Sequence, residues 1–110
     1  MLPKNDRFQR SDFRTYSPTH TRLHSAHLML GYSASPEVFK AVVTVSKQVS
    51  KLAVQRNKIR RMLYDVLAIN RPALRDGIYM VRVKVGAATV TKKQLQMELQ
   101  ELIGRVEKAR

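Results

Sequence analysis

The 110-residue sequence contains no cysteine. This absence excludes disulfide bonds, thiolate metal sites and cysteine nucleophiles, and it fits a reducing compartment. The sequence also lacks any apolar run near the roughly 18 residues that a membrane-spanning helix needs, and it has no cationic N-terminal stretch followed by an apolar segment. We therefore expect no membrane partner and no secretion, and a cytoplasmic location.

Carboxylates are the second scarce group. Only 8 Asp and Glu residues accompany 21 Lys and Arg, which gives a formal net charge of +13 and a pI near 10.8. A nuclease that holds its own metal ions needs clustered carboxylates, and here they are dispersed outside the last predicted helix. No arrangement of Ser, His and Asp indicates a nucleophile. The composition therefore favours a protein that binds a polyanion.

The hydrophobic pattern predicts a single α+β domain that spans residues 1–110. The predicted order is α, β, β, α, β, α, with room for one more short strand between Thr19 and Lys40. The predicted strands are residues 26–32, 38–47 and 78–85. In the last of these, strict alternation places Tyr79, Val81, Val83 and Val85 inward, with Arg82 and Lys84 outward.

The chain is organised around a basic helix predicted over residues 52–69. At about 100° per residue, its apolar and its cationic side chains fall on two arcs that hardly overlap. The predicted core arc holds Leu52, Ile59, Met62, Leu63, Val66, Leu67 and Ile69, and the other arc holds Arg56, Asn57, Arg60, Arg61 and Tyr64. Only Asp65 is close enough to neutralise a cation of this run. The arc is either a solvated helix face or, as the missing counter-charges lead us to expect, a surface that binds nucleic-acid phosphates.

Aromatic residues are few as well, with three Phe, four Tyr and no Trp. Phe13 and Tyr16 lie within one turn of a short predicted helix, where they are either core anchors or a stacking surface for bases. His20, His24 and His27 have a spacing that would suit a metal on a helix, but the Ser-, Thr- and Pro-rich stretch around them predicts a loop. We therefore expect no metal site at these histidines.

A last helix is predicted from Thr91 to about Lys108, with Thr91 as N-cap and Gln94 three residues on as in a capping box. Its predicted core face consists of Leu95, Leu99, Leu102, Ile103 and Val106. We expect its acidic residues Glu98 and Glu101 to be solvated rather than catalytic.

Two adjoining stretches carry a resemblance to a known family. Ser46 and Lys47 end a predicted strand, and the run AVQRNKIRR follows from Ala53 to Arg61. This pattern resembles the "RNR" motif of the bacterial ribonuclease P protein component. The opening residues 1–4, the late strand and Gly86-Ala87-Ala88 before the last helix also occur in the family order, so the resemblance covers nearly the whole chain.

The resemblance implies a two-layer α/β sandwich similar to ribosomal protein S5 domain 2, in the order α-β-β-(β)-α-β-α. It also implies a left-handed crossover through the basic helix, whereas the general default for such a connection is right-handed. In this family a large RNA holds Mg²⁺ and hydrolyses the phosphodiester that joins the 5′ leader to the mature tRNA. The protein would be inactive alone, would pair one-to-one with that RNA, and would raise the affinity for precursor tRNA and Mg²⁺.

The same resemblance assigns the site residues. Contacts to the catalytic RNA would come from Arg56, Asn57, Lys58, Arg60, Arg61, Lys47, Lys51 and Tyr64. A cleft for the leader would be lined by Phe13, Tyr16, Lys40, Thr44 and Ser46. No catalytic and no metal-ligating residue is expected in the protein. Tyr64 departs from the family pattern, in which another arginine is common at this place.

Three other functions are compatible with the composition. They are a ribosomal-type structural RNA-binding protein with an S5-like fold, a nuclease that uses the histidines, and a DNA-binding protein with the basic helix in a major groove. The dispersed carboxylates disfavour the nuclease, and the absence of a dimerisation element or helix-turn-helix spacing disfavours the DNA-binding protein. Only the extended motif favours ribonuclease P over the ribosomal type.

Overall fold

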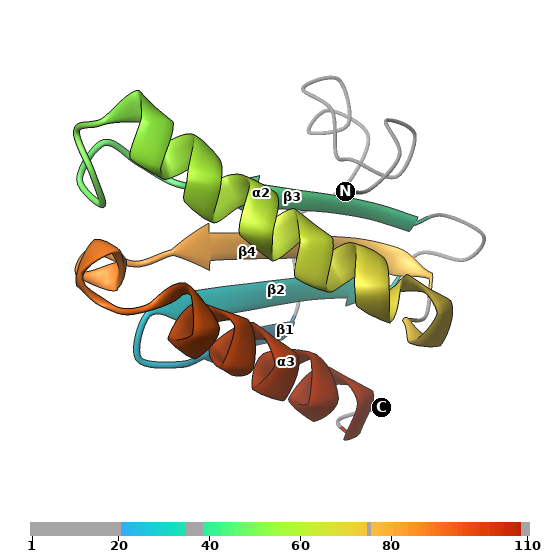
Figure 1. Cartoon of the computed structure of the whole chain (residues 1–110). Coiled ribbons are helices and arrows are strands. Elements are labelled where there is room, and N and C mark those ends of the chain that lie inside the picture. Colours follow the sequence, from blue (N-terminus) through green and yellow to red (C-terminus); the bar gives the residue numbers. More distant parts are fainter. Residues whose placement is uncertain (1–20, 35–38, 75, 109–110) are drawn as a thin grey trace.

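A computed structural model describes residues 21–34, 39–74 and 76–108 of the chain (Figure 1). Within these ranges, one four-stranded sheet is covered on one face by two long helices. The strands are β1 (Thr21–His24), β2 (Leu28–Ala34), β3 (Phe39–Thr44) and β4 (Gly77–Val83). The helices are α2 (Ala53–Asn70) and α3 (Lys92–Lys108), with short 3₁₀ turns η2 (Arg71–Ala73) and η3 (Ala87–Thr89). The predicted first helix, with Phe13 and Tyr16, lies outside the described residues.

The strand order in the sheet is β1-β2-β4-β3. β2 pairs antiparallel with β1 and β4, whereas β3 pairs parallel with β4. In Figure 1, β3 and β4 both run from right to left, and α2 returns from left to right on the viewer's side of the sheet. Because β4 lies below β3 in this view, the β3-α2-β4 crossover is left-handed, opposite to the general default. β1 is the additional strand for which the sequence left room.

The core lies between the sheet and the two helices. Alternate residues of β2, β3 and β4 face the helices and are buried, among them Leu30, Val43, Tyr79 and Val81. The predicted core face of α3 is confirmed, because all five of its apolar residues are buried. Each fully buried aliphatic side chain stabilises the fold by about 1.5–3 kcal/mol, so these faces fix the two helices on the sheet.

Three residues that the periodicity assigned to the core are exposed instead. Leu52 is 68% exposed, Ile69 is 79% exposed and Val85 is 66% exposed. Leu52 precedes the first residue of α2, Ile69 lies in its last turn, and Val85 follows the end of β4. The apolar pattern therefore continues in the sequence beyond the region in which the opposite layer offers a packing partner.

β4 begins at a glycine because another strand approaches closely there. Gly77 has φ +152°, and a Cβ on it would lie 2.6 Å from Cε1 of Tyr32 and 2.7 Å from the carbonyl oxygen of Ser33. A side chain at this position would therefore clash with β2. The Tyr32 ring packs instead on Tyr79, with the ring centroids 4.9 Å apart.

Candidate nucleic-acid interface

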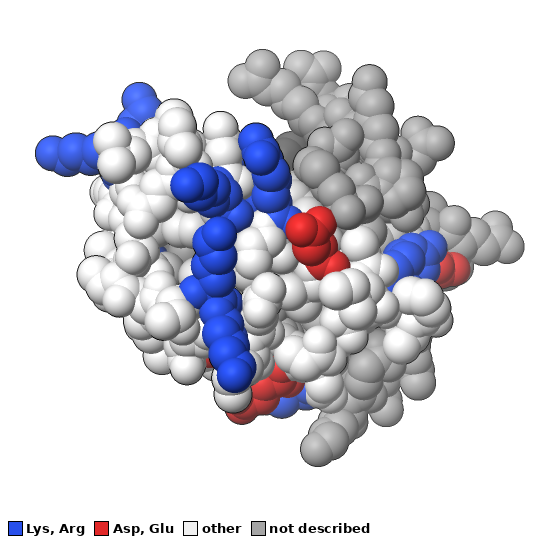
Figure 2. Space-filling model, viewed as in Figure 1, with Lys and Arg blue, Asp and Glu red and all other residues white. Residues whose placement is uncertain are grey.

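The cationic run lies in the first half of α2. Asn57, Lys58 and Arg61 are exposed, whereas Arg56 and Arg60 are partly buried. Arg56 Nη1 donates to the carbonyl oxygen of Ser50 at 2.9 Å, and Arg60 Nη1 donates to Asn57 Oδ1 at 2.7 Å. Figure 2 shows Lys and Arg side chains gathered over α2 with a small acidic area beside them. These side chains form what we call the helix surface, a row of guanidinium and ammonium donors on a rigid element.

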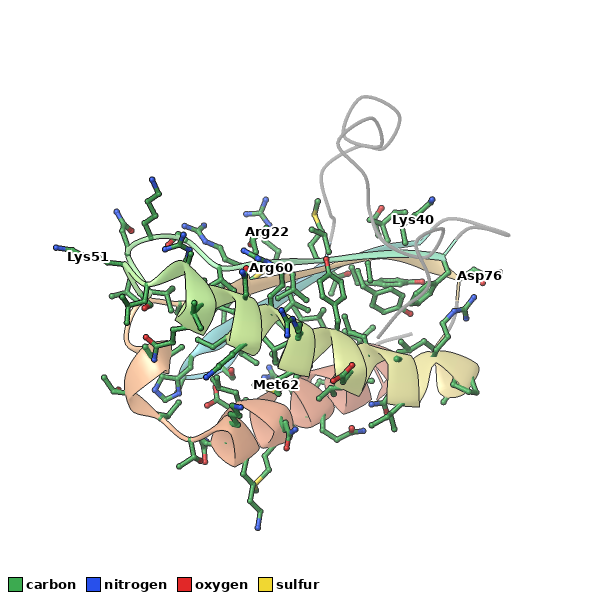
Figure 3. The ribbon with its side chains drawn as sticks, turned by 45° about the horizontal axis from the view of Figure 1, so that its top comes forward. Arg22, Lys40, Lys51, Arg60, Met62 and Asp76 are labelled. Carbon is green, nitrogen blue, oxygen red and sulfur yellow. The ribbon has the colours of Figure 1, made fainter. Side chains whose placement is uncertain are left out.

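The loop before α2 extends this surface. Its residue Val49 is buried and fixes the loop on the core, while Lys47 and Lys51 are exposed. Ser50 Oγ accepts from the backbone N–H of Leu52 at 3.2 Å and donates to Gln55 Oε1 at 2.6 Å. Since Leu52 supplies no capping side chain at the N-terminus of α2, these bonds order the helix entry. Figure 3 shows the Lys51 side chain pointing away from the N-terminal end of α2, so the cations continue beyond the helix.

Tyr64 lies among the cations in the helical projection, as predicted, but it is buried and does not share their exposed surface. It is 6% exposed, and its hydroxyl accepts a hydrogen bond from the backbone N–H of Val43 at 3.1 Å. Val43 is on β3, which stands at the edge of the sheet. The hydroxyl thus satisfies a buried donor of the edge strand, and the buried ring offers no face for stacking on a base.

We expect Tyr64→Phe to lower the free energy of unfolding by about 1–3 kcal/mol, because it leaves the buried N–H of Val43 without an acceptor. Urea unfolding measured by circular dichroism checks this. Tyr32→Phe is a matched control, since its hydroxyl donates to the carbonyl oxygen of the exposed Asp76, where water can replace it. Equal midpoints for Tyr64→Phe and the unmodified protein would contradict the assignment.

A second surface lies on the face of the sheet away from the helices. The strand register places His24, Met29, Arg82 and Thr44 opposite one another in a row across all four strands. The neighbouring row begins with Arg22 and continues through Gly31, Met80 and Val42. Figure 3 shows Arg22 and Lys40 projecting from this face, away from the helix layer. We call this the sheet surface; it combines cations with apolar side chains.

Two adjoining hollows mark one end of the sheet surface, each of about 280 Å³. The first is lined by Thr44, Ser46, Arg60 and Arg82, and by parts of Val43, Val45 and Val83. The second is lined by Arg22, His24, Met29, Ser46, Gln48, Arg82, Val83, Lys84 and Val85. They share Ser46, Arg82 and Val83, so they form one depression. Arg60 reaches it from α2, which joins the helix surface to the sheet surface.

The structure thus brings together part of the predicted leader cleft. Thr44 and Ser46 line the depression, while Lys40 lies on the same strand near its other end. Sequence reasoning did not assign Arg22 or Arg82 to the site. The alternation of the strand had placed Arg82 outward, but its position opposite Thr44 follows only from the β3–β4 register. Arg22 belongs to β1, the short strand that was predicted only as a possibility between Thr19 and Lys40.

The depression suits a single strand of nucleic acid. Guanidinium and ammonium groups can bind successive phosphates, and Met29 with Val85 offers apolar contact for a base. Among the described residues, no three His, Cys, Asp or Glu side chains gather to hold a metal ion. In the same part of the chain, no helix is long and apolar enough to cross a membrane.

Glu98 is buried, whereas the sequence predicted a solvated residue. It is 5% exposed and accepts hydrogen bonds from Ser25 Oγ at 2.6 Å, from His27 N at 2.8 Å and from Gln94 Nε2 at 3.2 Å. His27 Nδ1 lies 2.7 Å from its Oε2. Burial raises the pKa of Glu98, but the hydrogen bonds from Ser25, His27 and Gln94 outweigh it and lower that pKa from 4.5 to about 2. Glu98 is therefore an ionised anchor within the fold.

A basic α+β protein whose cationic helix adjoins a hollowed sheet face is a nucleic-acid-binding protein by its geometry and charge. Comparisons with known proteins specify which one. The family model for ribonuclease P matches residues 2–107 of the chain. The chain therefore belongs to the ribonuclease P protein family.

Individual relatives agree with this assignment. The ribonuclease P protein component of Geotalea uraniireducens is 28% identical over 97% of this chain and 96% of its own length. The component from a Pseudanabaena species is 32% identical over 90% of this chain and 85% of its own length. The solved structure of the Staphylococcus aureus RNase P protein has the same fold, with a TM-score of 0.77 and 21% identity over 96% of this chain and 97% of that chain.

Proposed function

We propose that this chain assists a catalytic RNA in removing the 5′ leader from precursor tRNA, as the RNA-binding protein subunit of the endoribonuclease ribonuclease P. Membership of the family supports the subunit role. The main observation in favour of two RNA-binding surfaces on one protein is the position of Arg60. This residue belongs to the basic helix and also lines the depression on the sheet surface. One protein can thereby contact two RNA segments at once.

The helix surface is proposed to bind the catalytic RNA. Its exposed members can reach phosphates without any change in the buried core. They are Asn57, Lys58 and Arg61, together with Lys47 and Lys51 of the preceding loop. Arg56 is tied to Ser50, so it orders the loop as well as adding charge. The assignment of these residues rests on their charge, exposure and continuity.

The sheet surface is proposed to bind the leader. Arg22, Arg82 and Lys84 supply cations there, and Thr44 and Ser46 supply hydroxyl groups. A single-stranded leader fits such a surface because its bases are free to make apolar and polar contacts. A folded tRNA body would not enter a depression of this size.

Mg²⁺ is proposed to be held mainly by the RNA. The described residues offer no cluster of carboxylates or histidines for it, and the carboxylates that are present include Glu98, which is occupied within the fold. The protein would contribute charge neutralisation, which lets two polyanions approach each other and lowers the Mg²⁺ concentration that they need. We propose one protomer per catalytic RNA and a cytoplasmic location. We also propose that the fold is similar to that of ribosomal protein S5 domain 2, which its two layers and left-handed crossover support.

Reconstitution tests the proposed function directly. We expect precursor tRNA to be cleaved at low Mg²⁺ by the protein together with a bacterial ribonuclease P RNA, and not by the protein alone. The RNA alone should need more Mg²⁺, because it lacks the cations of the protein. A mixture no faster than the RNA alone would instead favour a ribosomal-type RNA-binding protein, and cleavage by the protein alone would favour a self-sufficient nuclease.

The leader assignment has its own test. We expect Arg82→Ala to raise the Kd of the reconstituted complex for leader-bearing precursor by about fivefold, the loss of one charge-assisted contact, and to leave the Kd for mature tRNA unchanged. Lys93→Ala removes the same charge from the exposed surface of α3 and serves as the control. Fluorescence anisotropy with both RNAs measures the two constants. An equal loss for both RNAs would remove Arg82 from the leader site.

A further inference from the structure

Side chains from outside the turn between β1 and β2 hold it in place. Within it, Ser25 N donates to the carbonyl oxygen of Leu28 at 2.8 Å, and Leu28 N donates to Ser25 Oγ at 3.1 Å. Lys84 Nζ donates to the carbonyl oxygen of Ser25 at 2.9 Å, and Arg105 Nη1 donates to that of His24 at 3.2 Å. Lys84, which directly follows β4, and Arg105 of α3 therefore both bind the backbone of this turn.

Glu98 of α3 also binds this turn, from the helix layer. Ser25 has one hydroxyl hydrogen, and its 2.6 Å contact with Glu98 Oε1 is much shorter than its 3.3 Å contact with the carbonyl oxygen of Leu28. The hydroxyl therefore donates to Glu98, which leaves its lone pairs to accept the N–H of Leu28. The carboxylate also accepts the backbone N–H of His27, two residues further on. One side chain of α3 thus orients both sides of the turn.

The strand that this turn fixes carries part of the sheet surface. β1 has four residues and, in the described part of the chain, pairs with β2 alone. Its Leu23 packs toward the core, while Arg22 and His24 are exposed on the opposite face and line the second hollow. A slip of one residue would exchange these faces, and a single short ladder resists such a slip weakly. The position of Arg22 and His24 therefore depends on the turn.

We propose that Glu98 is a positioning residue for leader binding: from the face opposite the RNA, it holds β1 in the register that presents Arg22 and His24 to the nucleic acid. This inference rests on the proposed function. Glu98 itself is buried and lies in the helix layer, so it acts through Ser25 and His27 without touching RNA. Glu101, by contrast, is exposed on the same helix.

The test uses the protein reconstituted with a bacterial ribonuclease P RNA and measures Kd for leader-bearing precursor and for mature tRNA. We expect Arg22→Ala and Glu98→Ala each to raise the Kd for leader-bearing precursor by about fivefold, with mature tRNA unaffected. Glu98→Gln should restore most of this affinity, because its amide oxygen still accepts from Ser25 and from His27 N. Glu101→Gln is the matched control and should change neither constant. Ser25→Ala, a milder change, carries the same test if Glu98→Ala does not fold.

A double variant separates positioning from general destabilisation. If Glu98 acts through β1, combining Arg22→Ala with Glu98→Ala should weaken binding by less than the two single losses together, because both single variants lose the Arg22 contact. Additive losses, losses equal for both RNAs, or affinities that follow the melting temperatures of the variants would overturn the inference. A loss in Arg22→Ala with none in Glu98→Ala or Ser25→Ala would overturn it while leaving the proposed function standing. No loss in Arg22→Ala would remove Arg22 from the leader site, and the inference with it.

Discussion

Replacing Arg60 and Arg61 together by alanine is expected to weaken binding of the catalytic RNA by about tenfold to hundredfold, the loss of two charge-assisted contacts. The slope of log K against log salt concentration should fall in magnitude by about 1.5–2, because two fewer counterions are released on binding. Arg61 is exposed on α2, and Arg60 is held by Asn57 at the junction of the two surfaces. Titrations at several salt concentrations measure both quantities.

The control for this prediction keeps the net charge equal. Lys92→Ala with Lys93→Ala also removes two cations, but from exposed positions at the start of α3. We expect this pair to change the salt slope much less, since bound phosphates and not overall charge determine it. Equal changes for both pairs would mean that the helix surface has no special role and that the protein attracts RNA only through its net charge.

Glu98→Gln is expected to lower the free energy of unfolding by about 3 kcal/mol near neutral pH, the equivalent of a pKa shift from 4.5 to about 2. Because the pKa of Glu98 is lower in the folded than in the unfolded protein, its contribution is fully present above about pH 4.5. It is lost as the pH falls toward 2, where the folded protein also takes up the proton. The glutamine variant mimics the protonated side chain at every pH.

Urea unfolding of both proteins between pH 7 and pH 2 checks this expectation. The difference in free energy of unfolding should be constant above pH 5 and should shrink toward zero near pH 2. Glu101→Gln, on the exposed side of the same helix, should give a curve parallel to that of the unmodified protein. A difference that stays constant down to pH 2 would show that Glu98 stabilises the fold by its shape alone.

Local periodicity was a good guide where a residue's environment depends on its near neighbours. The predicted helices at residues 52–69 and 91–108 correspond to α2 and α3 within one residue at each end, and the core face of α3 was assigned correctly. Tyr64 shows the limit of this reasoning. Its position beside the cations in the helical projection is correct, but the neighbouring edge strand covers that side of the helix and takes its hydroxyl as an acceptor.

Glu98 was misjudged for a related reason. A carboxylate on an amphipathic helix is usually solvated, and nothing within four residues of Glu98 predicts otherwise apart from Gln94. Its principal partners, Ser25 and His27, are more than 70 residues away along the chain. Only the packing of α3 against the β1–β2 turn brings them together, and no periodic pattern records such a contact.

The sequence alone determined the class of this protein: a basic, cysteine-free α+β domain whose motif and charge indicate an RNA-binding subunit, with its cations on the first half of one helix. Tertiary structure alone decided which cations lie together. Arg22, Arg60 and Arg82 come from three separate elements, and they meet at one depression only because of strand register and a left-handed crossover. The physical reason is that hydrophobic periodicity fixes which side of each element is buried, whereas packing between distant segments fixes which exposed sides become neighbours.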